Sequence, residues 1–305
     1  MATAMKRLAS TTLVALTTVI CSASVSGCAA LGSYSPTARF ERQGIFQPAK
    51  YPSGDWSQTS VLVQDAHFTA EDGTRLHGWY VRHPQPKGHA LLLHGNAGNV
   101  TLLADTLRVL NQRHKLAVLA LDYRGYGKSE GTPSEEGLYQ DARAARKWLT
   151  ERESIGEGDI VLMGVSLGGA VAVDLASRDG ARGLVLASTF TSLPEAAQKH
   201  WPLVPMSLVL STRMNSLAKI KNYHGPLLMT HGDADEVVPY KQGQALYEAA
   251  PGSKRLITVS GGKHNSPQPE EYRVALDQFL NQLPPIGAST VQTASIDVSV
   301  EPLGP

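Results

Sequence analysis

The feature that most constrains the fold is a regular alternation of short apolar runs with segments of helical length. The apolar runs, each bounded by turn residues, are 89–93, 116–121, 160–163, 183–187, 226–230 and 255–259. The segments of helical length between and after them lie near 100–113, 135–152, 167–178, 240–250 and 269–282. Continuous apolar strands separated by helices are typical of a parallel sheet that is buried on both faces. We therefore expect an α/β fold with a mostly parallel central sheet flanked by helices.

Two further segments complete the expected domain. Residues 61–69 and 74–82 alternate apolar and polar side chains around Asp72-Gly73, which is a strong signal for an antiparallel hairpin at the N-terminal side of the sheet. The apolar excursion 190–222 lies between two predicted strands. It predicts a small cap over the sheet edge. The alternative is that its apolar residues are simply buried against the sheet.

The N-terminus has the pattern of a secretion signal. Lys6 and Arg7 precede an apolar stretch, 8–25, that is too short and too polar for a permanent membrane span. The stretch ends in VSGC at 25–28, which resembles the bacterial lipobox. That resemblance implies cleavage before Cys28, a diacylglycerol on its sulfur, and a new N-terminus open to acylation, for example by palmitate. The alternative is a plain signal peptide in which Cys28 is incidental.

These patterns divide the chain into expected parts. They are a lipoprotein signal peptide over 1–27, a lipidated tether and N-terminal packing segment over 28–59, the main domain over 60–285, and a disordered tail over 286–305. Aromatic residues such as Phe46 and Trp56 predict that the later half of the tether segment packs onto the domain. Of the two cysteines, Cys21 lies inside the signal, so no disulfide is expected within the mature chain. The mature protein is expected on the bacterial cell envelope, on its periplasmic or surface side.

The composition excludes several classes of partner. Lys and Arg total 28 against 27 for Asp and Glu, so the chain lacks the basic field that nucleic-acid binding requires. No Cys/His metal spacing, phosphate-binding loop or dinucleotide fingerprint is present, so no cofactor or metal is implied. The expected partners are a small-molecule or acylated substrate and a membrane reached through the lipid at Cys28. A monomer is favoured.

The candidate nucleophile is Ser166. In a parallel sheet, reactive groups gather on loops at the carboxyl ends of the strands. The sequence GVSLG at 164–168 follows a predicted strand and opens a helix, which is the strand–turn–helix context of the G-x-S-x-G motif. A nucleophile on a sharp turn needs small residues two positions away, where a side chain would collide with the neighbouring backbone. The alternative is a glycine-rich helix start with Ser166 as its N-cap.

A serine hydroxyl is a poor nucleophile without a base, and the base must be held by an acid. Within HGDADEVVP at 231–239, Asp233, Asp235 and Glu236 compete for the role of the acid. The turn into the helix at Pro239 favours Asp235, with Asp233 next. The remaining carboxylates are then expected to serve the helix N-terminus, where negative charge is favourable.

The candidate base is His264. The chain contains ten histidines, and most are expected to be surface or turn residues. His264 differs because it follows the last predicted strand and the pair Gly261-Gly262, which gives a loop able to bring the imidazole over the nucleophile. It also completes the chain order Ser…Asp…His that this arrangement of motifs requires.

Two backbone N–H groups are expected to hold the oxyanion, and losing one such donor costs about 3–4 kcal/mol. Leu167 supplies the first from the start of the helix after Ser166. The second is expected from the loop HGNAGN at 94–99, with Asn96 preferred and Ala97 as the fallback. The alternative for this loop is a simple helix-capping turn. A further loop, DYRGYGKSEG at 122–131, is interpreted as a structural brace for its neighbours.

With these motifs identified, the sequence resembles α/β-hydrolase-domain serine hydrolases, in particular the branch of serine-aminopeptidase-like proteins and acyl-protein thioesterase relatives. The resemblance covers roughly 60–283 through HGNAGN, DYRGYGKSEG, GVSLGG, HGDADEVVP and GGKHN, in that order. It implies the α/β-hydrolase fold, a triad of Ser166, Asp235 and His264, and hydrolysis of an ester, thioester or peptide through an acyl-enzyme. It does not choose among these substrates, because the fold carries many chemistries.

The sequence favours a serine hydrolase of carboxylic esters or thioesters with acyl or other hydrophobic substrates. The expected membrane anchor and the apolar excursion 190–222 both support this interpretation. One alternative is a serine exopeptidase, which needs a carboxylate to hold the amino terminus of its substrate, and Glu195 is available in the excursion. Another is a non-catalytic binding protein on the same fold. The complete triad argues against the last.

Overall fold

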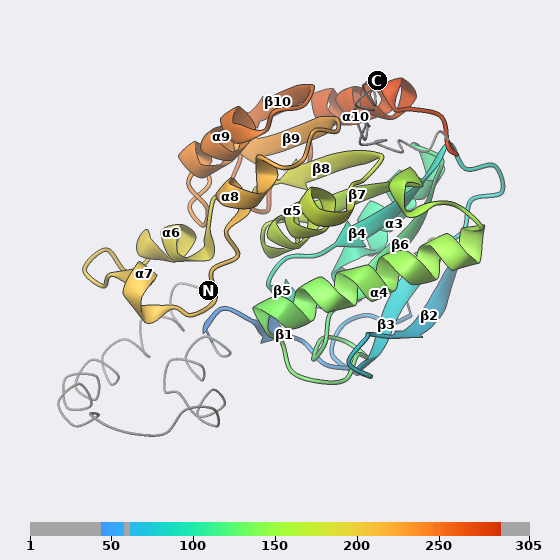
Figure 1. Ribbon diagram of the computed structural model, residues 1–305, viewed down its shortest axis with the longest axis horizontal. Coiled ribbons are helices and arrows are strands. Elements are labelled where there is room, and N and C mark those ends of the chain that lie inside the picture. The colour runs from blue at the N-terminus through green and yellow to red at the C-terminus, as the bar shows by residue number, and fades with distance from the viewer. Residues whose placement is uncertain (1–43, 58–61, 288–305) are drawn as a thin grey trace, which may run out of the picture. The chain divides into compact units, whose positions relative to one another are not determined.

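The computed structural model describes residues 44–57 and 62–287 (Figure 1). The predicted signal peptide, Cys28, the first part of the predicted tether, and residues 288–305 of the predicted tail lie outside the described residues. Across the described ranges, no helix combines the length and the apolar character that a membrane span requires.

The central sheet has the order β10-β9-β8-β7-β4-β6-β3-β2. Its parallel strands are β4 (Gly88–Leu93), β6 (Leu116–Asp122), β7 (Ile160–Val165), β8 (Gly183–Ala187), β9 (Leu227–Gly232) and β10 (Lys254–Val259). The antiparallel hairpin is β2 (Val63–Thr69) and β3 (Arg75–Val81), which joins the sheet through β6. Gly73 in the hairpin turn has a φ of 85°. The predicted α/β architecture and the N-terminal hairpin are therefore confirmed.

Helices cover both faces of the sheet. They are α3 (Ala104–Gln112), α4 (Glu135–Glu153), α5 (Leu167–Asp179), α9 (Tyr240–Ala249) and α10 (Glu270–Gln282). Successive residues of a strand point to opposite faces, so Leu91 and Leu93 of β4 pack in one apolar cluster with α4 and α5. Leu92 packs in a second cluster with α3 and α10. Figure 1 shows α4 and α5 on the near face and α3 behind the sheet.

The excursion between β8 and β9 contains three short helices, α6 (Leu193–Gln198), α7 (Met206–Val209) and α8 (Ser216–Ile220). Its apolar residues divide between two environments. Met206 and Met214 belong to the core, whereas Leu203 is 96% exposed and Leu208 is 82% exposed. The interpretation that its apolar residues are buried against the sheet therefore holds only in part, and the small cap stays a prediction.

A small second sheet was not predicted. β1 (Gln47–Pro48) and β5 (Ala97–Gly98) form a two-stranded parallel sheet. Next to it, the helix predicted near 100–113 begins as a 3-10 turn, η1 (Val100–Leu103), before α3. Asn99 caps η1 by accepting a hydrogen bond from the N–H of Thr101, which satisfies one of the donors left free at a helix start.

Candidate active site

Ser166 lies on a sharp turn between β7, which ends at Val165, and α5, which begins at Leu167. Its backbone has φ 53° and ψ −116°, a strained conformation for a residue with a side chain. The turn is held in place because the Ser166 N–H donates to the carbonyl of Ala187 at 2.9 Å, and the Thr189 hydroxyl donates to the Ser166 carbonyl at 2.8 Å. The sequence thus places this serine at the carboxyl edge of the sheet.

The glycines around Ser166 are required by close backbone packing. A Cβ on Gly164 would lie 2.3 Å from the Gly168 carbonyl oxygen, and one on Gly168 would lie 2.1 Å from that of Leu93. A Cβ on Gly169 would lie 2.5 Å from the Thr189 hydroxyl oxygen. These distances are far below van der Waals contact, so the collisions expected from the sequence are present.

The structure brings Asp235 and His264 together. The Asp235 Oδ2 atom lies 2.8 Å from His264 Nδ1, while its Oδ1 accepts hydrogen bonds from the N–H groups of Val237 and Val238, both at 2.8 Å. The Asp235 carboxylate is fully buried, and the His264 side chain is 11% exposed. This geometry fixes the imidazole ring and leaves its Nε2 for another partner.

The two other candidate carboxylates lie elsewhere. Asp233 Oδ1 accepts a hydrogen bond from the Gly261 N–H at 2.6 Å, so this side chain holds the turn that leads to His264. Its expected role at a helix N-terminus is not what the contacts show. Glu236 is exposed and borders a pocket next to His264. Among the three, only Asp235 forms a hydrogen bond with His264 in the described part of the chain.

Sequence reasoning missed the contact that His231 makes with Asp235. The Nε2 atom of this fully buried imidazole lies 3.3 Å from Asp235 Oδ2 and 3.0 Å from the Val238 carbonyl oxygen. Since both neighbours are acceptors, Nε2 carries the hydrogen. Nδ1 has no partner among the described residues, and Gly243 makes room for it, because a Cβ there would lie 2.2 Å away.

The pKa of Asp235 lies well below its ordinary value. Burial by itself would raise that pKa, but hydrogen bonds from His231 and His264 and the positive charge that His264 can carry outweigh burial. The carboxylate therefore stays ionised at any pH near neutrality. An ionised acid can stabilise an imidazolium at His264 when this residue takes up a proton.

Ser166, Asp235 and His264 all lie on the same edge of the sheet, after β7, β9 and β10. Ser166 and His264 do not form a hydrogen bond with each other in this structure, which is common in sites without substrate. The loop after β4 also reaches this edge, because a Cβ on Gly95 would lie 3.7 Å from the Ser166 Cβ. The backbone N–H groups of Asn96 and Leu167 donate no hydrogen bond to another described residue.

The loop 122–131 acts as a brace, in agreement with its interpretation from sequence. Asp122 Oδ1 accepts from the Val100 N–H at 2.9 Å, and Arg124 forms a buried ion pair with Asp141 at 2.8 Å. The Tyr126 hydroxyl donates to the carbonyl of Asn96 at 2.8 Å. These contacts hold neighbouring loops together and support the structural interpretation.

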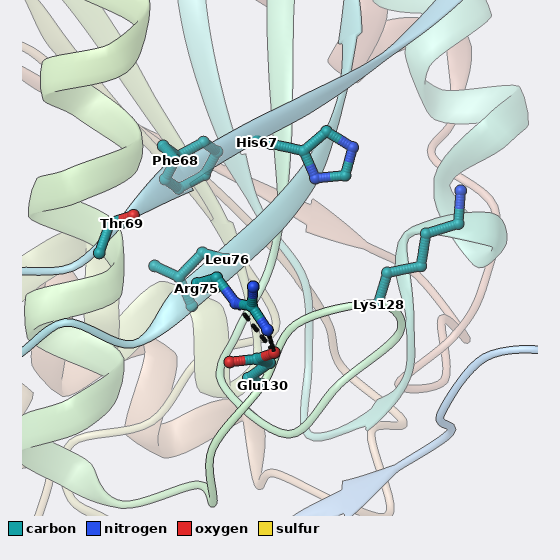
Figure 2. A pocket seen from close by; sticks show the side chains of 7 residues that line it. All are labelled: His67, Phe68, Thr69, Arg75, Leu76, Lys128 and Glu130. Carbon is teal, nitrogen blue, oxygen red and sulfur yellow. Dashed lines mark hydrogen bonds and ion pairs between the residues drawn. The ribbon is translucent and has the colours of Figure 1, made fainter.

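Two surface pockets differ in what they can do chemically. One, of about 410 Å³, is lined by Glu236, Val237, Lys263, His264, Asn265, Ser266 and Pro267. The other, of about 370 Å³, lies at β2 and β3, the strands farthest from β10 in the sheet. It is lined by His67, Phe68, Thr69, Arg75, Leu76, Lys128 and Glu130 (Figure 2). In the second pocket Arg75 is paired with Glu130 and Lys128 with Asp65. The first is the better candidate for substrate because His264 lines it, although Ser166 is not among its lining residues.

Within 44–57 and 62–287, no cluster of His, Cys, Asp and Glu side chains is arranged to hold a metal ion. The site has a hydroxyl on a strained turn, an imidazole held by a buried carboxylate, and the backbone N–H groups of Asn96 and Leu167, which donate to no other described residue. Such a set can transfer an acyl group from a substrate to the serine and then to water.

Comparisons with known proteins agree with this arrangement. A family model described as serine aminopeptidase, S33, matches residues 84–219. An uncharacterized protein of Mycobacterium tuberculosis is 38% identical over 252 residues, covering 81% of this chain and 89% of the relative. The α/β-hydrolase domain-containing protein WAV2 of Arabidopsis thaliana is 32% identical over 211 residues, covering 64% of this chain and 68% of WAV2. The esterase Pf2001 of Pyrococcus furiosus has a TM-score of 0.67 at 22% identity, covering 78% of this chain and 98% of Pf2001.

Proposed function

The chain belongs to the α/β-hydrolase family, and from this premise we propose that it is a serine hydrolase of carboxylic esters or thioesters. The observation that carries the proposal is the 2.8 Å hydrogen bond between His264 and the buried Asp235, on the sheet edge where Ser166 lies on its strained turn. The structural neighbour Pf2001 is described as an esterase, which is consistent with this proposal.

In the proposed reaction, His264 Nε2 removes the proton from the Ser166 hydroxyl as the oxygen attacks the acyl carbonyl carbon. The carbonyl oxygen becomes an oxyanion that accepts hydrogen bonds from the N–H groups of Asn96 and Leu167. The carbon–oxygen or carbon–sulfur bond to the leaving group then breaks, and the leaving group takes the proton from His264. A water molecule repeats the sequence on the acyl-enzyme and releases the carboxylic acid.

Hydrophobic acyl groups are the proposed substrates. Val237 is 41% exposed and lines the pocket beside His264, and Leu203 and Leu208 present further apolar surface in the excursion between β8 and β9. Burying apolar substrate surface against such side chains is favourable by about 25 cal/mol per Å².

The alternative function is that of an exopeptidase. It is supported by the match of the chain to the S33 serine aminopeptidase model. Glu195 is exposed and its carboxylate accepts from the Thr191 hydroxyl.

A substrate panel separates these possibilities. The purified protein is assayed with p-nitrophenyl acetate, butyrate and octanoate, with an acyl thioester, and with aminoacyl p-nitroanilides. We expect turnover of the esters and the thioester, higher for butyrate and octanoate than for acetate, and none of the anilides. Cleavage of the anilides without cleavage of any ester would favour the exopeptidase. A folded protein that turns over nothing on the panel would favour a binding protein.

We also propose that the mature protein is attached to the cell envelope by a lipid on Cys28. Each buried CH₂ of the acyl chains would contribute about 0.8 kcal/mol to membrane binding, so two or three chains would hold the protein firmly. Replacing Cys28 with Ser is expected to abolish labelling by an alkyne-tagged palmitate and to move the protein into the soluble fraction. Cys21→Ser is the matched control, because the signal in which Cys21 lies is removed. Persistent lipid labelling of Cys28→Ser would contradict the lipobox.

A further inference from the structure

The segment 45–53, which we call the strap, lies alongside the loop 94–99 that follows β4. Two backbone hydrogen bonds join them as a parallel pair. The Gln47 N–H donates to the Asn96 carbonyl at 2.9 Å, and the Ala49 N–H donates to the Gly98 carbonyl at 3.0 Å. The strap contributes β1 and the loop contributes β5 to the small two-stranded sheet.

Two asparagine side chains of the loop reinforce this pairing. Asn96 Nδ2 donates to the Ile45 carbonyl at 2.9 Å. Asn99 Nδ2 donates to the carbonyls of Ala49 at 2.9 Å and Ser53 at 2.8 Å, and the Asn99 side chain is almost completely buried. Hydrogen bonds from a buried donor are costly to lose, so Asn99 fixes the loop to the strap strongly.

The strap is itself anchored on its other side. Phe46 is 3% exposed and belongs to the core. The Gly127 N–H donates to the Ala49 carbonyl at 3.0 Å, and the Tyr51 N–H donates to the Gly127 carbonyl at 2.9 Å. The strap therefore connects the loop after β4 to the loop after β6, and its position is set by the core and by both loops.

We infer that the strap positions the oxyanion donor of this enzyme and that Asn99 is the positioning residue. The inference rests on the proposed function, because it takes the Asn96 N–H as a donor to the oxyanion. The loop that carries this N–H lies against Ser166 at Gly95. A displacement of such a donor by about 1 Å can cost on the order of 100-fold in rate, since the donor must face the oxygen of the transition state.

The chain offers a matched control for Asn99. Asn111 is also buried, and its Nδ2 also donates to two backbone carbonyls, those of Arg82 at 3.2 Å and Leu116 at 2.9 Å. Leu116 begins β6, at the opposite edge of the sheet from Ser166. Asn→Asp at either position replaces two donated hydrogen bonds with repulsion between oxygen atoms. Only the change at Asn99 acts on the strap.

We expect Asn99→Asp to lower kcat for ester hydrolysis by about 10- to 100-fold with KM changed less than about threefold. The Ki of a trifluoromethyl ketone, which forms a tetrahedral adduct on serine, should rise by the same factor as kcat falls. Asn111→Asp should lower the melting temperature by about as much as Asn99→Asp does, while its kcat and Ki stay within about twofold of the wild-type values. Equal losses of kcat in both variants, or no loss in Asn99→Asp, would overturn the inference.

A second variant decides the question if Asn99→Asp does not fold. Ala49→Pro removes the N–H that donates to the Gly98 carbonyl and leaves the Asn99 side chain unchanged. It should show the same fall in kcat, unchanged KM and raised Ki, and an unchanged kcat would overturn the inference. If Ser166→Ala abolishes turnover but the strap variants do not lower kcat, the inference about the strap fails and the proposed function stands. Turnover that survives in Ser166→Ala overturns both.

Discussion

Replacing Ser166 with Ala is expected to lower kcat for ester hydrolysis by about 10⁵- to 10⁶-fold, because no acyl-enzyme can form without the hydroxyl oxygen. The fold should be preserved, since the Ser166 contacts that hold the turn come from its backbone N–H and carbonyl. Activity is measured with a p-nitrophenyl ester, and folding by circular dichroism and thermal unfolding.

Ser188 provides the matched control for this substitution. It is also a buried serine, it also has a positive φ, 48° against 53° for Ser166, and it directly follows β8 on the same edge of the sheet. Ser188→Ala should keep kcat within a few-fold of wild type. An unchanged kcat in Ser166→Ala, or an equal loss in Ser188→Ala, would remove Ser166 from the mechanism.

Replacing Asp235 with Asn is expected to lower kcat by about 10⁴-fold with KM nearly unchanged. A neutral amide cannot stabilise the imidazolium that forms at His264. Its NH₂ group would also take the place of Oδ2, so that a donor and no longer an acceptor would face His264 Nδ1. The two neighbouring carboxylates serve as controls for charge. Asp233→Asn keeps an oxygen that can accept from the Gly261 N–H, and Glu236 is exposed.

Both control substitutions, Asp233→Asn and Glu236→Gln, should change kcat by less than about tenfold. Steady-state kinetics on the same ester gives kcat and KM for all three variants. If Asp233→Asn lowered kcat as much as Asp235→Asn does, the assignment of Asp235 as the catalytic acid would be contradicted. A similar loss in all three would point to the general disturbance of this loop as the cause.

The sequence was sufficient for the parallel sheet and for the positions of the reactive loops. Runs such as 116–121 and 160–163 are apolar at every or nearly every position, and a strand can be apolar at successive positions only where both of its faces are covered. The glycines around Ser166 likewise had a steric reason that could be stated before the structure. These signals are local, and each can be recognised within ten residues.

The strap could not be predicted because its signal is not local. β1 and β5 have only two residues each, too few to show a period, and they lie about fifty positions apart in the chain. What sets their register is a contact such as that of Asn96 Nδ2 with the Ile45 carbonyl, and an asparagine in a loop is equally compatible with an ordinary turn. The predicted packing of Phe46 onto the domain was correct, but its consequence for the loop after β4 was not visible.

His231 shows a different limit. It lies inside a motif that was recognised, yet the motif does not reveal that its Nε2 faces Asp235. That contact depends on the turn between β9 and α9, in which Asp235 Oδ1 accepts the Val237 and Val238 N–H groups and Oδ2 turns toward both imidazoles. In the excursion, apolar composition did not distinguish Leu203, which is exposed, from Met206, which is buried, because no helical period extends over so short a segment.

The most direct test of an activated Ser166 is labelling of the purified protein with a fluorophosphonate probe, followed by mass spectrometry of the labelled peptide. The probe reacts with serine hydroxyl groups that an adjacent base activates. We predict a single modified residue, Ser166, with labelling abolished in Ser166→Ala and retained in Ser188→Ala. A folded wild-type protein that is not labelled, or one labelled at another residue, would contradict the assignment of Ser166 as the nucleophile.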